Sequence, residues 1–210
     1  MSGIMLNMVG GTFGGIPVIG DAFGGGFFAG QISTAGNGVA DYNLVIGPIA
    51  SAQSSLQWKI VATTTSGTTS VIDGPSNSSA MNDATHPCAQ FCEGLTIGGF
   101  SDWYMPAKNE LEVCYFNLKP DTTSNVTNSG TNANAVPARA SNYTTGNPAQ
   151  TSAVLFKVDA AQPFAIDNYW SSSEFSSTVA WRQYFGNGYQ KNYGSKSSAN
   201  LVRAIRRIPA

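Results

Sequence analysis

Thiol and imidazole groups, the side chains most able to bind a metal or attack a substrate, are scarce in this sequence. The cysteines are Cys88, Cys92 and Cys114, and His86 is the single histidine. A spacing of four residues places Cys88 and Cys92 on one face of a helix, so a Cys3His zinc site can be drawn. The pattern His-x-Cys-x3-Cys is not a usual zinc spacing, however, and Pro87 lies inside it. We expect small buried thiols, no metal and no cofactor.

Other catalytic arrangements are equally hard to assemble. A Ser-His-Asp triad would depend on His86, which directly precedes a proline where a helix is expected to break. The glycine-rich stretch Gly10-Gly-Thr-Phe-Gly-Gly15 lacks the lysine of a phosphate-binding loop. No spacing of carboxylates is typical of a glycosidase. We therefore expect a protein that is not an enzyme.

The end of the chain offers a different chemistry, that of a recognition surface. Tyrosine, serine, asparagine and arginine are the residue types of adaptable binding surfaces, and they are concentrated between residues 182 and 200. The residues that we assign to this candidate face are Arg182, Tyr184, Asn187, Tyr189, Lys191, Asn192, Tyr193, Lys196, Ser198 and Asn200. The alternative interpretation, that they are solvated hairpin residues without a ligand, stays open.

A β-hairpin must position this face. The segment Phe185-Gly-Asn-Gly-Tyr189 carries an Asn-Gly signal, which favours the turn type that matches strand twist. Because side chains alternate along a strand, the predicted strand divides its residues between two sides. One side holds Trp181, Gln183 and Phe185, and the other holds Arg182 and Tyr184.

Further elements follow from apolar periodicity and turn residues. Residues 108–118 predict a helix, with Leu111, Cys114, Tyr115 and Leu118 on one stripe. Residues 78–95 have helical spacing that Pro87 should kink or split. Residues 119–150 form a long polar loop without apolar period, of a length that is usually functional or held by a neighbour. The predicted strands are residues 27–33, 42–49, 58–63, 169–170, 180–185, 188–193 and 201–208.

Composition narrows the class of protein. Only 11% of the 210 residues are charged, whereas 42% are hydrophobic, so a buried core is feasible in one domain. The last 50 residues carry six cationic and two acidic side chains, a net charge of +4, and residues 1–160 therefore carry −5. A net charge of −1 does not suit a protein that neutralises phosphates, so we expect no nucleic-acid partner.

The first 22 residues differ from the rest of the chain. Residues 1–20 carry no charged side chain but include many large apolar ones, which flexible Gly/Ser linkers usually lack. We interpret residues 1–22 as a docking arm and residues 23–210 as the domain; a disordered leader is the alternative. The missing lysine and arginine argue against a signal peptide, and no apolar run is long enough for membrane insertion.

Two segments are specific enough to carry a resemblance. They are Gly98-Gly-Phe-Ser-Asp-Trp-Tyr-Met-Pro-Ala-Lys-Asn-Glu-Leu-Glu112 and Tyr169-Trp-Ser-Ser-Ser-Glu174, followed by Ala180-Trp181 and Val202-Arg-Ala-Ile-Arg206. In this order they resemble the domain at the C-terminus of bacterial collagen-like adhesins, which also occurs in phage tail and virion proteins. The resemblance implies an α+β, C-type-lectin-like fold with twisted antiparallel sheets, two short helices and long irregular loops.

Within these motifs we expect structural rather than catalytic roles. The residues concerned are Asp102, Trp103, Pro106, Glu110, Trp170, Glu174, Trp181 and Arg203. Asp102 beside a turn should cap backbone donors, the three tryptophans should fill the core, and Pro106 suits the first turn of a helix. Glu110 stands where a capping box needs it, but Ala107 lacks the reciprocal hydroxyl. We expect Glu174 to bind backbone amides or to pair with Arg203.

The resemblance also allows two known activities of related proteins to be compared with this sequence, formylglycine generation and calcium-dependent sugar binding. The related formylglycine-generating enzyme needs late reactive cysteines, and none follows Cys114 here. The Glu-Pro-Asn and Trp-Asn-Asp loops of calcium-dependent lectins are absent as well, so we expect no calcium.

Two functions remain as expectations. The first is a receptor-binding subunit of a phage tail fibre, or another surface-displayed adhesin, that engages a host glycan or protein. The alternative is a capsid-decorating or other structural virion protein without a receptor. Both place the protein on a virion, as a homo-oligomer (a trimer, by analogy with phage appendages) that contacts other virion proteins through its N-terminal arm.

Overall fold

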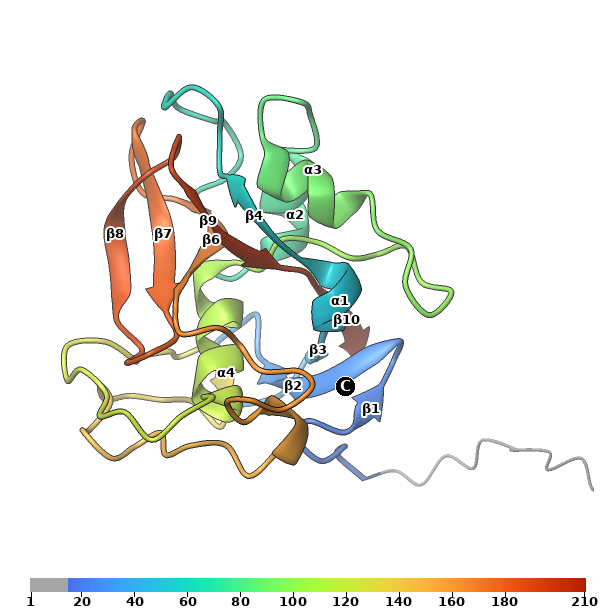
Figure 1. The fold of residues 1–210 in the computed structure, drawn as a ribbon, viewed down its shortest axis with the longest axis vertical. Coiled ribbons are helices and arrows are strands. Elements are labelled where there is room, and N and C mark those ends of the chain that lie inside the picture. The colour runs from blue at the N-terminus through green and yellow to red at the C-terminus, as the bar shows by residue number, and fades with distance from the viewer. Residues whose placement is uncertain (1–14) are drawn as a thin grey trace, which may run out of the picture.

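The computed structural model describes residues 15–210, which form two five-stranded sheets connected by helices and loops (Figure 1). The first sheet contains β1 (Ala22–Phe23), β2 (Gly26–Ile32), β3 (Tyr42–Ile46) and β10 (Ile205–Pro209) in this order, and β5 (Ala135–Val136) pairs with β2. The second has the order β4 (Gln53–Gln57), β9 (Ala199–Arg203), β6 (Asn168–Glu174), β7 (Val179–Tyr184) and β8 (Gln190–Ser195). The pairings are antiparallel except for one parallel bridge between β6 and β9.

Short helices accompany the sheets. They are α1 (Ile49–Ala52), α2 (Gly74–Ser79), α3 (Pro87–Glu93), α4 (Lys108–Leu118) and a 3-10 turn, η1, at Val154–Phe156. The predicted α+β class with antiparallel sheets is confirmed, but the part of the chain that the structure describes has four α-helices rather than two. None of these helices is long and apolar enough to cross a membrane.

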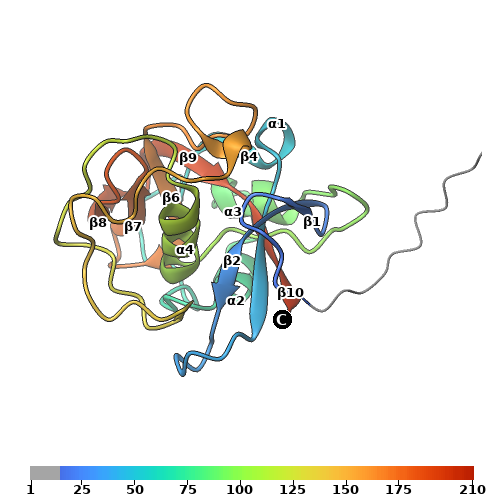
Figure 2. The same cartoon turned by 90° about the horizontal axis from the view of Figure 1, so that it is seen from below.

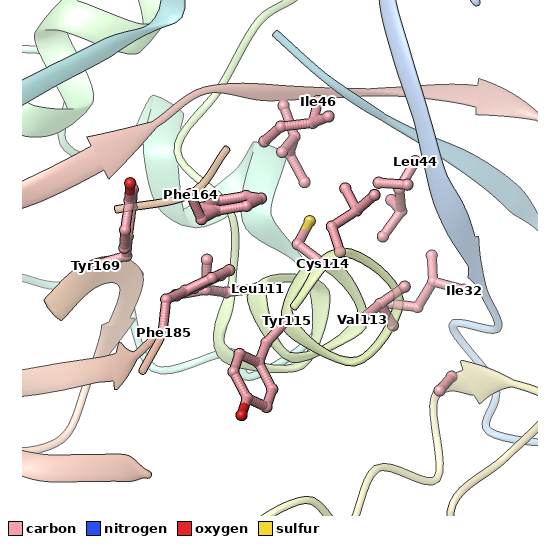
Figure 3. Packing of buried hydrophobic residues seen from close by; sticks show 14 of the residues in the cluster. Ile32, Leu44, Ile46, Leu111, Val113, Cys114, Tyr115, Phe164, Tyr169 and Phe185 are labelled. Carbon is pink, nitrogen blue, oxygen red and sulfur yellow. The ribbon is translucent and has the colours of Figure 1, made fainter. Parts of the chain in front are cut away.

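Helix α4 begins and ends as predicted and organises the larger of two cores (Figures 1 and 2). Leu111, Cys114 and Tyr115 belong to one buried cluster that includes apolar side chains of both sheets (Figure 3). On the sheet side Phe164 stacks on Phe185, with ring centroids 4.0 Å apart. An amphipathic helix usually buries only its apolar face. In α4, however, eight of the eleven side chains are buried, because residues 119–150 cover the opposite face.

The second core lies between β4, β6, β9 and helix α3. Trp58, Trp103 and Trp170 are its largest side chains, and each is at most 1% exposed. Trp58 was predicted to begin a strand, but the strand ends at Gln57. Its indole N–H instead donates to the Ser171 carbonyl at 2.9 Å, so the side chain is part of the core.

Pro87 and Pro106 lie near the beginnings of helices α3 and α4. Pro87 splits the predicted 78–95 helix: α2 ends at Ser79 and Pro87 is the first residue of α3, where its missing N–H costs nothing. Pro106 was placed in the first turn of α4, which is wrong, since it precedes the N-cap residue Ala107. Its carbonyl accepts from the Ser172 N–H at 2.8 Å and so joins the helix start to β6.

The C-terminal segment joins the two sheets. The single strand predicted over residues 201–208 is two strands, because the chain passes from β9 to β10 at Ala204. Ala204 donates to the Ala52 carbonyl and accepts from the Gly47 N–H, at 2.9 and 3.0 Å. The adjacent Arg203 is fully buried and donates to carbonyls of Gly47, Gln162 and Pro163 rather than to a carboxylate.

The acidic residues of the recognised motifs hold the sheets and loops together. Asp102 accepts both branches of the Arg206 guanidinium at 2.7 and 2.9 Å, so its expected role as a turn cap is replaced by an ion pair with β10. Glu110 accepts from the Ala107 N–H at 2.8 Å, which is the predicted half of a capping box. It also accepts from Arg207 at 2.7 Å; burial nevertheless raises the pKa of Glu110.

Glu174 caps a neighbouring loop. Its carboxylate accepts from the Thr65 N–H at 2.7 Å and the Thr68 hydroxyl at 3.1 Å. The predicted bond to a backbone amide is therefore present. The predicted cationic partner, Arg203, was wrong, since the ammonium of Lys196 lies 3.2 Å from the carboxylate.

The predicted arm, residues 1–22, lies partly outside the described residues. From Ile19 onward the segment contacts the domain: Ile19 packs against the α4 core, and the Gly20 N–H donates to the Phe28 carbonyl at 2.8 Å. Ile16 and Val18 are 70% and 67% exposed.

Candidate ligand-binding face

The predicted hairpin forms from β7 and β8, with its turn at the predicted Asn-Gly pair. Gly188 has a φ of +75°, and a Cβ there would lie 2.4 Å from the Tyr115 ring. Glycine is required at this position both for its backbone conformation and for its close approach to α4. The Asn187 carbonyl accepts from the Val126 N–H at 3.0 Å, so the long loop helps to hold the turn.

The two sides of β7 differ as alternation predicted. Gln183 lies on the α4 side and is buried, and Phe185 just beyond the strand is buried there too, whereas Arg182 and Tyr184 are half-buried on the other side. Trp181 is the exception to its expected core position. It is half-buried, between the Lys108 ammonium, 4.8 Å from its ring, and the Phe175 ring.

Cationic and aromatic side chains alternate on the side of this sheet that faces away from α4, where Trp170 at one end of the row is buried in the second core. The strand register aligns Trp170, Arg182 and Lys191 in one row over β6, β7 and β8. The Arg182 guanidinium lies 5.9 Å from the Trp170 ring, and the Lys191 ammonium lies 5.5 and 5.4 Å from the rings of Tyr184 and Tyr189. Burial, and secondarily the charge of Arg182, lowers the pKa of Lys191. The two neighbouring cations thus favour a ligand that brings hydrogen-bond acceptors.

Two buried donors adjoin this row. Asn200, on β9, accepts from Arg182 Nη1 at 3.0 Å through its Oδ1, but its Nδ2 has no hydrogen-bond partner among the side chains and backbone that the structure describes. The indole N–H of Trp170 likewise lacks one within the structure, and Trp170 was expected to serve the core alone. Asn200 was predicted to lie on the face, but the sequence carried no signal for the Trp170 donor, because it meets Arg182 only through the pairing of β6 with β7.

Similarity to known proteins identifies the family to which the chain belongs. The family model described as the Lcl C-terminal domain, a domain of collagen-like adhesins, matches residues 48–206, three quarters of the chain. The chain belongs to this family. No curated protein matches it. A solved structure, a fimbrial protein from Bacteroides ovatus ATCC 8483, is similar at 16% identity and a TM-score of 0.44, over 78% of this chain and 35% of that one. The Lcl C-terminal domain described here thus spans about a third of that fimbrial chain.

Not every residue assigned to the face lies on it. The assignment of Lys196 to the face was wrong, because its side chain is fully buried. The ammonium donates to the carbonyls of Thr63 and Ser177 and pairs with Glu174. It also lies 4.6 Å from the Trp58 ring, so it is a structural residue of the second core. Ser198 is exposed in the turn between β8 and β9. The side chains of Asn192 and Tyr193 lie outside the described residues.

The thiols of this Lcl C-terminal domain are free and buried. Burial raises the pKa of Cys88 and Cys92 well above the usual thiol value, which disfavours the reactive thiolate form. His86 contacts the Thr65 hydroxyl at 2.8 Å and Asp83 at 3.0 Å. Over residues 15–210 there is no group of three or more side chains that could hold a metal ion.

Proposed function

We propose that this Lcl C-terminal domain is the recognition part of a surface-displayed adhesin, and that it binds rather than transforms its target. Membership in a family of collagen-like adhesin domains supports the adhesin role. We place the binding site on the outer side of β7 and β8 and define the binding face as Arg182, Tyr184, Tyr189, Lys191 and Asn200. The target is a cell-surface glycan or protein that presents hydroxyl, carbonyl or carboxylate oxygens.

The observation that carries this proposal is the position of Lys191 between two half-exposed tyrosine rings, in one row with Arg182. Tyrosine rings give rigid contact area at low entropic cost, and the cations donate to acceptor oxygens. No residue of the binding face is acidic. The hairpin is braced by the Gln183 amide, which donates to the Tyr143 hydroxyl at 3.2 Å, so the face is held by the core of the domain.

The experiment is a binding titration of the full chain on immobilised glycans and on host cells. Lys191→Met should weaken binding about tenfold, which corresponds to about 1.4 kcal/mol. Lys157→Met is the matched control, since Lys157 is also a half-buried lysine but lies beyond η1. Equal binding by the Lys191 variant and wild type, with both folded, would refute the assignment of the face.

We further propose that the adhesin is a subunit of a phage tail fibre. The motifs of the chain resemble those of phage tail and virion proteins, which supports this setting. Labelled antibodies against the protein should mark the fibre tip of intact particles and block adsorption.

The second candidate is a structural virion protein, either a capsid decoration or a fibre-base subunit. Its support is the exposure of Ile16, Val18 and Val154 at the end of the domain where residues 1–14 attach, which suits a docked subunit. Labelling of the capsid, with adsorption unaffected, would favour this candidate over the receptor-binding one.

A further inference from the structure

An apolar patch surrounds the start of the described chain, at the lower end of the molecule in Figure 1. We define the patch by the exposed side chains Ile16, Val18, Val154 and Leu155, whose exposed fractions are 70%, 67%, 72% and 43%. Val18, Val154 and Leu155 line one cavity of about 300 Å³, so residues distant in sequence form one surface. Exposed aliphatic side chains gathered in this way mark an interaction site.

A second cavity continues the patch on the other side of the same segment. It has a volume of about 430 Å³, and its apolar walls come from Ile16, Pro17, Ile19, Phe28, Val136 and Pro137. The polar groups in its lining are the side-chain amides of Gln31 and Asn117, and no charged residue lines it. The occupant that fits such a cavity is therefore an uncharged, apolar segment.

Residues 1–14 of this chain have that chemistry. They include Ile4, Met5, Leu6, Met8, Val9 and Phe13 and no charged side chain. Fourteen residues can span at most about 46–50 Å when extended. A domain of this size has a radius of gyration of about 17 Å. The segment is therefore long enough to leave its own domain and cross a neighbouring copy.

We propose that residues 1–14 of one copy bind in the apolar patch and the adjoining 430 Å³ cavity of a second copy. The patch and the cavity lie next to the point where the segment attaches, since Ile16 belongs to the patch and both Ile16 and Pro17 line the cavity. Copies related by a rotation axis near this point can therefore exchange their segments reciprocally, which gives a closed assembly. This inference does not depend on the binding face, because β7 and β8 lie away from the patch (Figure 1).

The first test is the mass of the full chain in solution, measured by light scattering across a range of concentrations. Wild type should be oligomeric. Lysine at two exposed patch positions, Val18→Lys with Val154→Lys, should raise the dissociation constant at least tenfold without changing the circular dichroism spectrum. The matched control is Ile60→Lys with Val61→Lys, because these aliphatics are 47% and 61% exposed in the loop after β4, at the opposite end of the molecule. The control should assemble as wild type does.

The second test separates exchange between copies from other occupants. Leu6→Asp with Val9→Asp should weaken assembly at least tenfold through the segment, just as the double lysine variant weakens it through the patch. Mixing the two defective proteins should restore a hetero-oligomer, because one intact segment then meets one intact patch. A monomeric wild type would overturn the proposal. This holds whether the segment binds to its own domain or is left to bind a different protein. Failure of the mixture to assemble would overturn it as well.

Discussion

Glu112 anchors the long polar loop to the helix that organises the core, and its substitution is the sharpest test of how this fold is held. The side chain is fully buried on α4. Its carboxylate accepts from Arg139 Nε at 3.0 Å, Asn132 Nδ2 at 2.6 Å and the Tyr143 hydroxyl at 2.7 Å, and Arg139 Nη2 makes a further contact. All of these donors lie within residues 119–150, the segment without apolar periodicity.

Glu112→Gln should destabilise the domain strongly. The substitution keeps the shape but removes the charge and turns one acceptor into a donor that faces other donors. Breaking a buried ion pair from one side costs about 3–5 kcal/mol, and the lower end applies because the Arg139 side chain keeps 12% exposure. About 3 kcal/mol corresponds to a loss of about 6–12 °C in melting temperature for a domain of this size.

The measurement is chemical denaturation together with hydrogen exchange of the loop amides. Exchange should increase within residues 119–150 before it increases in α4, because the loop loses its anchor first. Glu93→Gln, at a half-buried glutamate on α3, is the control and should change stability little. Adding Arg139→Met to Glu112→Gln should restore part of the loss, since it removes the unpaired cation. A loss below about 1 kcal/mol with unchanged loop exchange would refute this account.

Three further outcomes follow from other side chains of the domain. Trp170→Ala should cost about 3–5 kcal/mol in urea unfolding, and the half-buried Trp181→Ala less than half of that. Hydrogen bonding, above all from the Thr85 hydroxyl, lowers the pKa of Asp83 to about 2, so Asp83 stabilises the fold above about pH 4 and this contribution is lost as the pH falls through 2. The stability difference between wild type and Asp83→Asn should therefore be fully present at pH 6 and should decrease as the pH falls from 4 through 2. Lys196→Met should cost about 3 kcal/mol by leaving its buried carboxylate partner unpaired, yet ligand binding per folded molecule should not change.

Elements governed by local rules could be predicted from the sequence. The apolar stripe of α4, the interruption at Pro87 and the Asn-Gly turn of the hairpin each depend on neighbours within a few residues. Such preferences act whatever the rest of the chain does, and for this reason the helix and the hairpin form where they were expected.

The environment of individual polar side chains depended on the tertiary structure. Lys196 and Lys191 lie five residues apart on or beside one strand, but only Lys196 is buried, because Glu174 and two carbonyls from other segments surround it. Burial of an ammonium is feasible only where distant acceptors meet it, and local pattern cannot show that. The donors of Trp170 and Asn200 came together in the same way, through strand pairing.

The sequence by itself therefore determined the α+β class, the family motifs and the position of the β7–β8 hairpin, since these depend on periodicity, turn chemistry and motif order. Only the tertiary structure decided which of its polar residues stabilise the domain and which lie on the binding face. The physical reason is that a polar side chain can be buried only with partners, and here the partners of Glu112, Glu174 and Arg203 lie more than 15 residues away along the chain.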